Sequence, residues 1–251
     1  MCRILALTAN RPFRPEPWLR SFAQRCRESH EYQGDGWGLA WWNGTEWERR
    51  RALKPIWSET FDAVPRSSAY LVHARSAFTG SPLALDLTMP FLGGGCAFAF
   101  NGELRGVRLS VPGANGAQRL FTLFQRFRDA EGDSPSALTR LDQVVSKRTD
   151  YVRALNVVIA DGAGIHLTSR FNQEPDYFTM HATEQARGQA GEPISVVCSE
   201  PLAVPGAVVP WRPVPSGVRL TLPVPGHGRS HRGSPGALPL PPTRTESSCS
   251  S

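Results

Sequence analysis

Cys2 combines two groups that could do chemistry together once Met1 is removed. It follows Met1 directly and opens the run Cys2-Arg3-Ile4-Leu5-Ala6-Leu7. Without Met1, one residue would carry both a thiol nucleophile and a free α-amine, whose ordinary pKa of about 7.7–8.0 suits a general base at neutral pH. A terminal nucleophile can use its own amine in this way. The alternative is that Cys2 is the second residue of a buried first strand.

A thiol that attacks an amide also needs donors for the oxyanion that forms. Asn101-Gly102 follows the apolar run Cys96–Phe100, which we expect to be a strand that ends there. The side-chain amide of Asn101 and the backbone N–H of Gly102 could both point at one oxygen. Asn-Gly is also a common hairpin turn, so both interpretations stay open from these residues alone.

Arg75 could fix a substrate that carries a carboxylate. It lies just beyond the apolar run Ala69–His73, and a guanidinium can grip a carboxylate through two parallel hydrogen bonds. The alternative is a surface arginine at a strand end. His73 has period-two spacing with Arg75 and could reach the same site, but we favour a structural role for it as a satisfied core histidine.

Gly36-Trp37-Gly38 lies in the glycine-dense segment 34–38. Glycine lets a backbone approach a ligand closely, so this segment is a candidate pocket wall. The alternative is a tight loop with Trp37 in the core.

The composition predicts one globular domain and a tail. Of 251 residues, 40% are hydrophobic and 20% are charged, which is ordinary for a globular protein. Residues 1–225 are enough for a single core. Residues 226–251 are rich in Pro, Gly, Ser and Arg and contain no aromatic residue, so we expect a disordered tail.

Charge and cysteine usage bear on partners and location. The net charge is +6, part of it in the tail, and the run Arg49-Arg50-Arg51 is too short for a nucleic-acid site. The five cysteines are widely spaced, without the spacing of metal ligands. We therefore expect no nucleic acid, metal or cofactor. Without a signal-like or bilayer-spanning stretch, we also expect no membrane association and a reducing cytoplasm with free thiols.

The elements that must position these residues are strands grouped between helices. Apolar patterning predicts helices over 18–27, 118–127 and 137–145. It predicts strands over 4–9, 39–42, 45–51, 69–73, 96–100, 155–160, 164–169 and 194–199, with a further strand-like segment over 211–222. Asn43-Gly44 is expected to form a two-residue hairpin turn and Asp161-Gly162 another. Hairpins with helices between them indicate a layered α+β fold.

Four motifs occur in order along the chain: Met1-Cys2-Arg3, Gly34-Asp35-Gly36-Trp37-Gly38, His73-Ala74-Arg75 and Asn101-Gly102-Glu103. In this order they resemble class II glutamine amidotransferase domains of the N-terminal nucleophile hydrolase superfamily. The resemblance is strongest to the stand-alone branch whose proteins begin Met-Cys-Arg. It extends to about residue 222, through Cys198-Ser199-Glu200-Pro201-Leu202 and Trp211.

The resemblance implies a four-layer αββα sandwich and a specific chemistry. Met1 would be removed, and Cys2 would attack the side-chain amide of glutamine to form a thioester that water then hydrolyses. Asn101 and Gly102 would form the oxyanion hole, Arg75 would hold the substrate α-carboxylate, and Gly36-Trp37-Gly38 would belong to the pocket wall.

The chain departs from that family before the helix at 118–127. The family commonly has an aspartate there that holds the substrate α-ammonium, whereas this chain reads Gly113-Ala114-Asn115-Gly116-Ala117-Gln118. Asn115 or Gln118 could accept only a neutral hydrogen bond. Phe100 and Met89 also stand where histidines are usual. The cysteine chemistry is retained, and the substrate becomes the open question.

Two hypotheses follow. The first is an amidohydrolase that acts on glutamine or a γ-glutamyl compound and releases ammonia or an amine, with any ammonia-using reaction left to a separate synthase or amidase subunit. The second is a catalytically impaired relative that acts as a binding or regulatory subunit.

Overall fold

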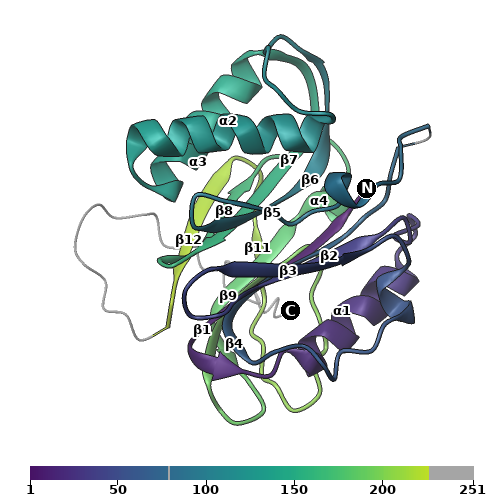
Figure 1. Cartoon of the computed structure of the whole chain (residues 1–251), viewed down its shortest axis with the longest axis vertical. Helices are drawn as coiled ribbons and strands as arrows, with labels where there is room; N and C mark the ends of the chain where they lie inside the picture. Colours follow the sequence, from purple (N-terminus) through teal and green to yellow (C-terminus); the bar gives the residue numbers. More distant parts are fainter. Residues whose placement is uncertain (79, 226–251) are drawn as a thin grey trace, which may run out of the picture.

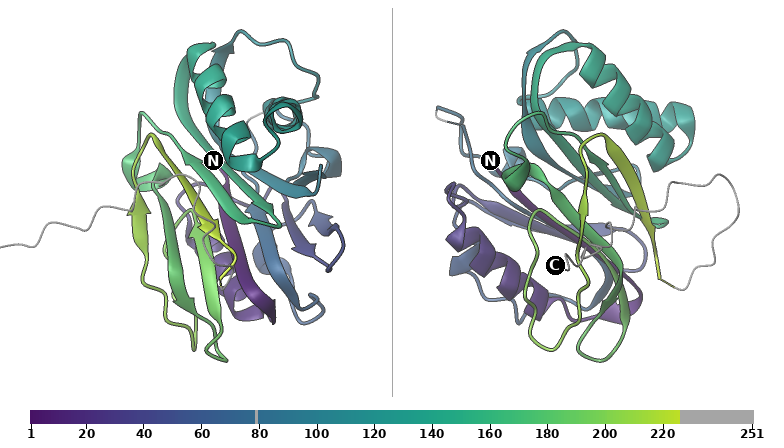
Figure 2. Two further views of the ribbon diagram at one scale, coloured as in Figure 1. Left: turned by 90° about the vertical axis from the view of Figure 1, so that its left-hand side faces the viewer. Right: turned by 180° about the vertical axis from the view of Figure 1, so that it is seen from behind.

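The computed structural model describes residues 1–78 and 80–225. The predicted tail, 226–251, lies outside the described residues. The described chain forms two antiparallel sheets that stack face to face, with helices on both outer sides (Figures 1 and 2). One sheet has seven strands in the order β11-β9-β10-β1-β4-β2-β3, and the other has five in the order β12-β8-β7-β6-β5.

The elements have the following bounds. The seven-stranded sheet contains β1 (Arg3–Phe13), β2 (Trp37–Trp42), β3 (Trp47–Ala52), β4 (Ser67–Ala74), β9 (Met180–Arg187), β10 (Pro193–Cys198) and β11 (Arg212–Val214). The five-stranded sheet contains β5 (Phe91–Gly93), β6 (Cys96–Val107), β7 (Thr149–Asp161), β8 (Gly164–Ser169) and β12 (Val218–Pro223). The α-helices are α1 (Glu16–Glu28), α2 (Gly116–Glu131), α3 (Ser134–Lys147) and α4 (Pro175–Phe178), and short 3-10 turns cover Ile56–Ser58 and Leu85–Leu87.

The alternation of side chains along the strands divides the core into layers. In β1, Leu5 and Leu7 face α1, whereas Ile4 and Ala6 face the other sheet. In β6, Phe98 packs on α2 and α3, and Ala97 and Ala99 fill the space between the sheets. Small side chains in this middle layer let the two sheets approach closely. The result is the predicted four-layer αββα sandwich, so the fold-class prediction is confirmed.

The helices follow from their sequence patterns. Leu120, Leu123 and Phe124 recur at helical spacing and are buried under α2. Asn115 caps this helix, because its side chain accepts a hydrogen bond from the backbone of Gln118. Asp133 caps α3 in the same way. These helices cover the face of the five-stranded sheet that would otherwise expose its apolar side chains.

Some predicted boundaries are wrong. The loop after β2 spans residues 43–46 rather than two residues, and β3 begins at Trp47 rather than at Thr45. The side chain of Asn43 accepts backbone hydrogen bonds from Thr45 and Glu46, both at 2.9 Å, which favours this longer turn.

Three further differences concern strands. The strand predicted to end at Phe100 continues through Asn101-Gly102 to Val107, so this dipeptide is not a hairpin turn. The strand-like segment 211–222 divides into β11 and β12, which belong to different sheets. The polar β9, with its charged outward face, and the three-residue β5 were not predicted, because neither has a marked apolar alternation.

No helix within residues 1–78 and 80–225 is long and apolar enough to cross a membrane.

Candidate active site

The structure brings four predicted site residues, Cys2, His73, Arg75 and Gly102, to one cavity of about 580 Å³. The cavity lies where the beginning of β1 and the end of β4 meet the middle of β6, and its far wall is formed by the beginning of α2 and the chain that leads to it. A nucleophile, a cation and a strand backbone therefore share one solvent-accessible space.

Cys2 points into the space between the sheets. Ile4 and Ala6 face this space, so the alternation along the chain places Cys2 on the same side. Its thiol donates to the carbonyl oxygen of Ser76 with an Sγ–O distance of 3.7 Å. Burial raises the pKa of the Cys2 thiol, and the Ser76 hydrogen bond, the N-terminal charge and Arg75 oppose this. Because its pKa is raised, the thiol needs a base before it can attack.

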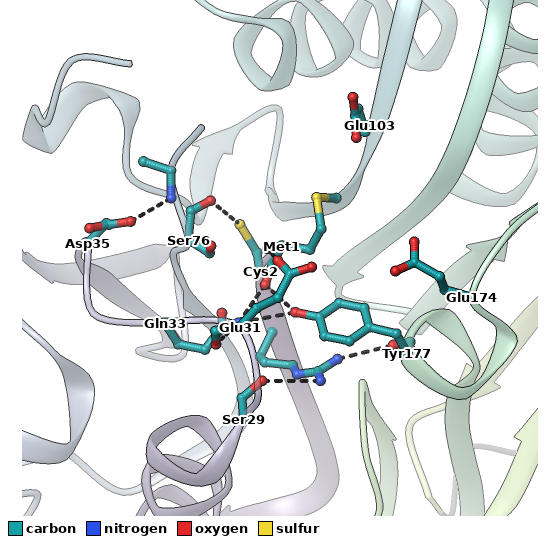
Figure 3. Close-up of polar contacts among 12 residues, drawn as sticks. Met1, Cys2, Ser29, Glu31, Gln33, Asp35, Ser76, Glu103, Glu174 and Tyr177 are labelled. Atoms are coloured by element: carbon teal, nitrogen blue, oxygen red, sulfur yellow. Dashed lines mark hydrogen bonds and ion pairs between the residues drawn. The ribbon is translucent and has the colours of Figure 1, made fainter. Parts of the chain in front are cut away.

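Met1 occupies the position next to this nucleophile (Figure 3). Its α-ammonium pairs with Glu31. Its carbonyl oxygen accepts hydrogen bonds from the Tyr177 hydroxyl at 2.5 Å and from Gln33 Nε2 at 2.6 Å. Its side chain is buried with Ala154 and Tyr177. While Met1 is present, the nitrogen of Cys2 is an amide and cannot act as a base.

The oxyanion candidate Gly102 lies at an open edge of β6. The N–H of Phe100 points away from β7, because it donates to the sulfur of Met89 at 3.2 Å. Leu155, opposite Gly102 on β7, donates its own N–H to Arg170 on the far side. Hydrogen-bonding direction alternates along an antiparallel strand, so Gly102 presents its N–H away from β7, toward the cavity.

This edge is open because β5 is short. The pairing of β5 with β6 covers Cys96–Phe98 and stops before Phe100. A side chain at position 102 would overlap the carbonyl oxygen of Ala154, so the backbone here requires glycine.

Asn101 is buried, with 1% of its surface exposed, and lies opposite Asn156 of β7. Both polar atoms of its side-chain amide are buried without a hydrogen-bond partner among the described residues. Buried amides are normally satisfied, so a pair of unused polar atoms next to Gly102 is a feature that needs a ligand or a solvent molecule.

Arg75 is held in place by backbone contacts. Its N–H donates to the carbonyl of Gly36 at 2.8 Å, and its own carbonyl accepts from Asp35 at 3.1 Å. In the guanidinium, Nη2 donates to the carbonyl of Pro82 at 3.0 Å, and Nη1 is buried without a partner. One arm of the guanidinium is therefore anchored, and the other is available to an acceptor in the cavity.

His73 is fully buried in β4, opposite Ile4. Burial, and then the charge of Arg75, lower the pKa of His73 to about 3, so it is neutral at physiological pH. Its ring nitrogens make no hydrogen bond of good geometry with the described residues. His73 therefore lies in the core, where the backbone of Phe100 partly opposes the lowering of its pKa, and it also lines the cavity. Its structural role and its role in substrate binding both stay predictions.

The segment Gly36-Trp37-Gly38 lies behind the site rather than on the cavity surface. Trp37 is fully buried under α1, where its Nε1 donates to Glu59 at 3.3 Å. Gly36 has a φ of 130° and accepts the N–H of Arg75. A side chain at Gly38 would overlap the carbonyl of Met89. The structure thus places these residues where they support Arg75 and the chain that leads into β5.

Sequence reasoning did not find several residues around the site. Glu103 lines the cavity, and its position directly after Asn101-Gly102 on an alternating strand could have indicated it. Glu31, Gln33 and Tyr177 hold Met1, but nothing in the local sequence pattern points to them. Residues 1–78 and 80–225 contain no group of three His, Cys, Asp or Glu side chains that could hold a metal ion.

Comparisons with known proteins concern the family and the fold of the chain. The sequence profile of the class II glutamine amidotransferases matches residues 1–165. The chain is 33% identical over 125 residues to "Gamma-glutamyl-hercynylcysteine sulfoxide hydrolase" from two strains of Mycobacterium tuberculosis, and the match covers 46% of this chain and 54% of the relative. The chain therefore spans about half the length of the curated relatives it matches.

Solved structures share the fold at low sequence identity. A predicted glutamine amidotransferase from Pseudomonas aeruginosa has a TM-score of 0.57 at 19% identity, covering 88% of this chain and 97% of that one. A class-II domain protein from Silicibacter pomeroyi has a TM-score of 0.55 at 18% identity, covering 88% and 95%. The glutamine phosphoribosylpyrophosphate amidotransferase of B. subtilis has a TM-score of 0.53 at 14% identity, covering 79% and 42%.

Proposed function

Because the chain belongs to the class II glutamine amidotransferase family, we propose that it uses Cys2 to hydrolyse the γ-amide of a glutamyl compound. The observation that carries this proposal is the shared cavity of Cys2, Arg75 and Gly102, which combines a thiol, a guanidinium with a free arm and an open strand edge. These are the groups that an attack on an amide beside a carboxylate requires.

In the proposed reaction, removal of Met1 gives Cys2 a free α-amine that takes the proton of the thiol. The thiolate attacks the γ-carbonyl carbon, and the oxygen of that carbonyl receives hydrogen bonds from the Gly102 N–H and the Asn101 side-chain amide. The carbon–nitrogen bond then breaks, and the amine leaves with the proton from the α-ammonium. Water attacks the thioester, which forms the γ-carboxylate and restores the thiol.

Arg75 has the role of binding the substrate rather than of acid–base chemistry. Its unpartnered Nη1 can meet the α-carboxylate of the glutamyl group, while Pro82 keeps the other arm in place. A charge-assisted contact of this kind is about twice as strong as a neutral hydrogen bond. It would set the distance between the carboxylate and the γ-carbonyl, and so select a glutamyl chain length.

We propose hydrolysis of a γ-glutamyl amide in preference to transfer of ammonia to a separate synthase subunit. Two observations support this choice: the name of the 33% identical relative, and a cavity whose volume of about 580 Å³ lies in the range of pockets that hold drug-sized ligands. A cytoplasmic location is also proposed, supported by the free thiols of Cys2, Cys26, Cys96 and Cys198.

Labelling by a glutamine-like diazo-ketone, measured by intact mass, tests the proposal. We expect one adduct in protein that lacks Met1, lost in Cys2→Ala and retained in Cys96→Ala, whose thiol is buried at the beginning of β6 and does not line the cavity. We also expect glutamate release from at least one member of a panel of γ-glutamyl amides. A protein that lacks Met1 but forms no adduct and releases no glutamate would refute catalysis and favour the role of a binding subunit.

A further inference from the structure

We propose that the preferred substrate is a glutamyl γ-amide whose α-nitrogen carries an apolar acyl group. This inference rests on the proposed function and concerns the substrate class of the same site. It follows from the groups that line the cavity, because a free α-ammonium requires an acceptor there, whereas an acylated nitrogen is neutral and brings an apolar chain.

The side-chain oxygens at the beginning of α2 already accept backbone hydrogen bonds. Asn115 Oδ1 accepts the backbone N–H of Gln118 at 2.8 Å, as the cap of the helix. Gln118 Oε1 accepts the backbone N–H of Ala114, also at 2.8 Å. Each oxygen already accepts one backbone hydrogen bond, so it could offer a substrate ammonium only its second lone pair, which is neutral.

Glu103 is the carboxylate among the cavity-lining residues that the structure describes, and it too has partners. Its Oε1 is paired with the guanidinium of Arg105, and its Oε2 accepts from Arg153 Nη1 at 3.2 Å. Only 9% of its surface is exposed. Arg153 is shared with Glu174 and Glu31, and Arg105 pairs with Glu103 alone among the described residues, so Glu103 would have to exchange an existing ion pair to hold an additional cation.

The same cavity wall presents positive charge. Arg75 is nine-tenths buried, with Nη1 unpartnered, and the guanidinium of Arg119 lines the far end. The 16-residue helix α2 begins at Gly116, which also lines the cavity, and a helix N-terminus carries partial positive charge. A substrate α-ammonium would enter a region where the uncompensated charge has its own sign. The α-carboxylate would be attracted, and a neutral acyl amide would not be repelled.

The remaining wall is apolar and offers space for a chain. Leu104 and Leu109 from β6 and the segment after it, and Leu120 and Leu123 from α2, line the side of the cavity beyond Gly102. Phe78 lies at the rim with 54% of its surface exposed. An acyl chain on the α-nitrogen could bury itself there, and removing each methylene group from water favours binding.

The reaction on such a substrate breaks and forms the same bonds as the hydrolysis proposed above. The bond between the γ-carbonyl carbon and the amide nitrogen breaks, water supplies the new carboxylate oxygen, and the leaving amine takes the proton. The products are an N-acylglutamate and ammonia or an amine. The acyl bond on the α-nitrogen remains intact.

Three p-nitroanilides with one leaving group test the proposal: γ-L-glutamyl-p-nitroanilide, its Nα-hexanoyl derivative and its Nα-hexyl derivative. The hexyl compound keeps the cationic nitrogen with a chain of the same length, so it separates charge from size. With the full chain lacking Met1, we expect kcat/KM for the hexanoyl compound to exceed both others by about tenfold or more. Ammonia release from glutamine and Nα-hexanoylglutamine should show the same order, independent of the aromatic leaving group.

A charge reversal on the cavity wall gives a second, independent readout. Arg119→Glu places a carboxylate in the first turn of α2, where an acidic residue also suits the helix. Arg126→Glu makes the same change of charge on an exposed part of the same helix outside the cavity lining, and serves as the control. We expect Arg119→Glu to reduce the preference for the hexanoyl compound by about two- to fivefold, the range of exposed ion pairs, and Arg126→Glu to leave it unchanged.

The possible results separate this inference from the proposed function. Cleavage of the free or hexyl amine at a rate equal to or above that of the hexanoyl compound overturns the substrate class and leaves the Cys2 hydrolase intact. An unchanged preference in Arg119→Glu overturns the charge argument. Failure to cleave any of the five compounds overturns the substrate class together with hydrolysis itself.

Discussion

Two asparagines that lie opposite each other on β6 and β7 should respond in opposite ways to the same substitution. Asn101 has both side-chain polar atoms buried without partners, whereas Asn156 donates to the carbonyl of Phe178 at 2.8 Å and accepts the N–H of Arg170 at 3.2 Å. Both side chains are buried. Leucine has the same branched arrangement of four side-chain heavy atoms as asparagine, with methyl groups in place of the polar atoms, so it removes the amide without leaving a cavity.

The magnitudes follow from the hydrogen bonds. An unsatisfied buried polar group costs about 1–3 kcal/mol, so Asn101→Leu should leave the free energy of unfolding unchanged or raise it by about 1 kcal/mol. Asn156→Leu strands a carbonyl and an N–H, and should lower the free energy of unfolding by about 2–4 kcal/mol. Loss of one oxyanion donor typically lowers kcat by about 10²–10³-fold, so Asn101→Leu should be stable and nearly inactive.

Urea unfolding followed by tryptophan fluorescence gives the stabilities, and release of p-nitroaniline from the best substrate gives kcat. Asn156→Leu is compared at a temperature where it remains folded. The reasoning would be refuted if Asn101→Leu destabilised the protein as much as Asn156→Leu, or if it retained kcat within a few-fold of the original protein.

Three further predictions concern charge and protonation. Arg75→Lys keeps the charge but loses the planar fork, and should lower kcat/KM by about 10- to 100-fold with a smaller effect on kcat; equal losses in both would contradict a binding role. Burial opposes ionisation of Asp161, but hydrogen bonds from His166 and other partners lower its pKa from 3.8 to about 2. The resulting stabilisation is complete above pH 3.8 and is lost as pH falls toward 2, so the original protein should lose about 2 kcal/mol over this window and Asp161→Asn less, measured by urea unfolding. Because the pKa of His73 is about 3, it should contribute no limb to the pH profile of kcat/KM between pH 5 and 8. A limb of the pH profile near pH 6.5 that disappears in His73→Asn would contradict this prediction.

The residues that carry local signals were predictable from the sequence. Cys2, Arg75 and Gly102 each follow or precede an apolar strand, and the structure brings them to one cavity. Helices α1 and α2 were predictable because their apolar residues recur at a helical period, Trp18 with Phe22 in α1 and Leu120 with Phe124 in α2. The grouping of strands and helices predicted a layered α+β fold, and the family resemblance implied its four layers.

What the sequence did not predict depends on contacts between distant segments. Asn101-Gly102 has the composition of a turn, and only pairing with β7 keeps it extended, because Asn101 lies opposite Asn156. Glu31 and Tyr177 come together around Met1 from segments 146 residues apart. One partner of Glu103, Arg153, likewise comes from another strand, β7. Local patterns carry no information about such pairings.

The hydrogen bonds of Asn115 and Gln118 show a second reason why the sequence alone does not define the site. Composition alone marks both side chains as possible acceptors for a substrate. The structure shows that a helix cap and a loop contact use their oxygens. Whether a polar side chain can bind a substrate depends on the groups that already contact it. The sequence gives only the type of the side chain.

The short length of β5 has a consequence for how this protein can evolve. Pro90 precedes the strand and has no N–H to extend its pairing with β6, and Met89 takes the N–H of Phe100 instead. Substitutions that lengthened β5 past this point would add sheet hydrogen bonds and cover the edge that Gly102 presents. Selection for greater stability and selection for activity therefore act in opposite directions at this strand. Variants obtained by screening for thermal resistance alone should accumulate substitutions here that reduce the activity of the site.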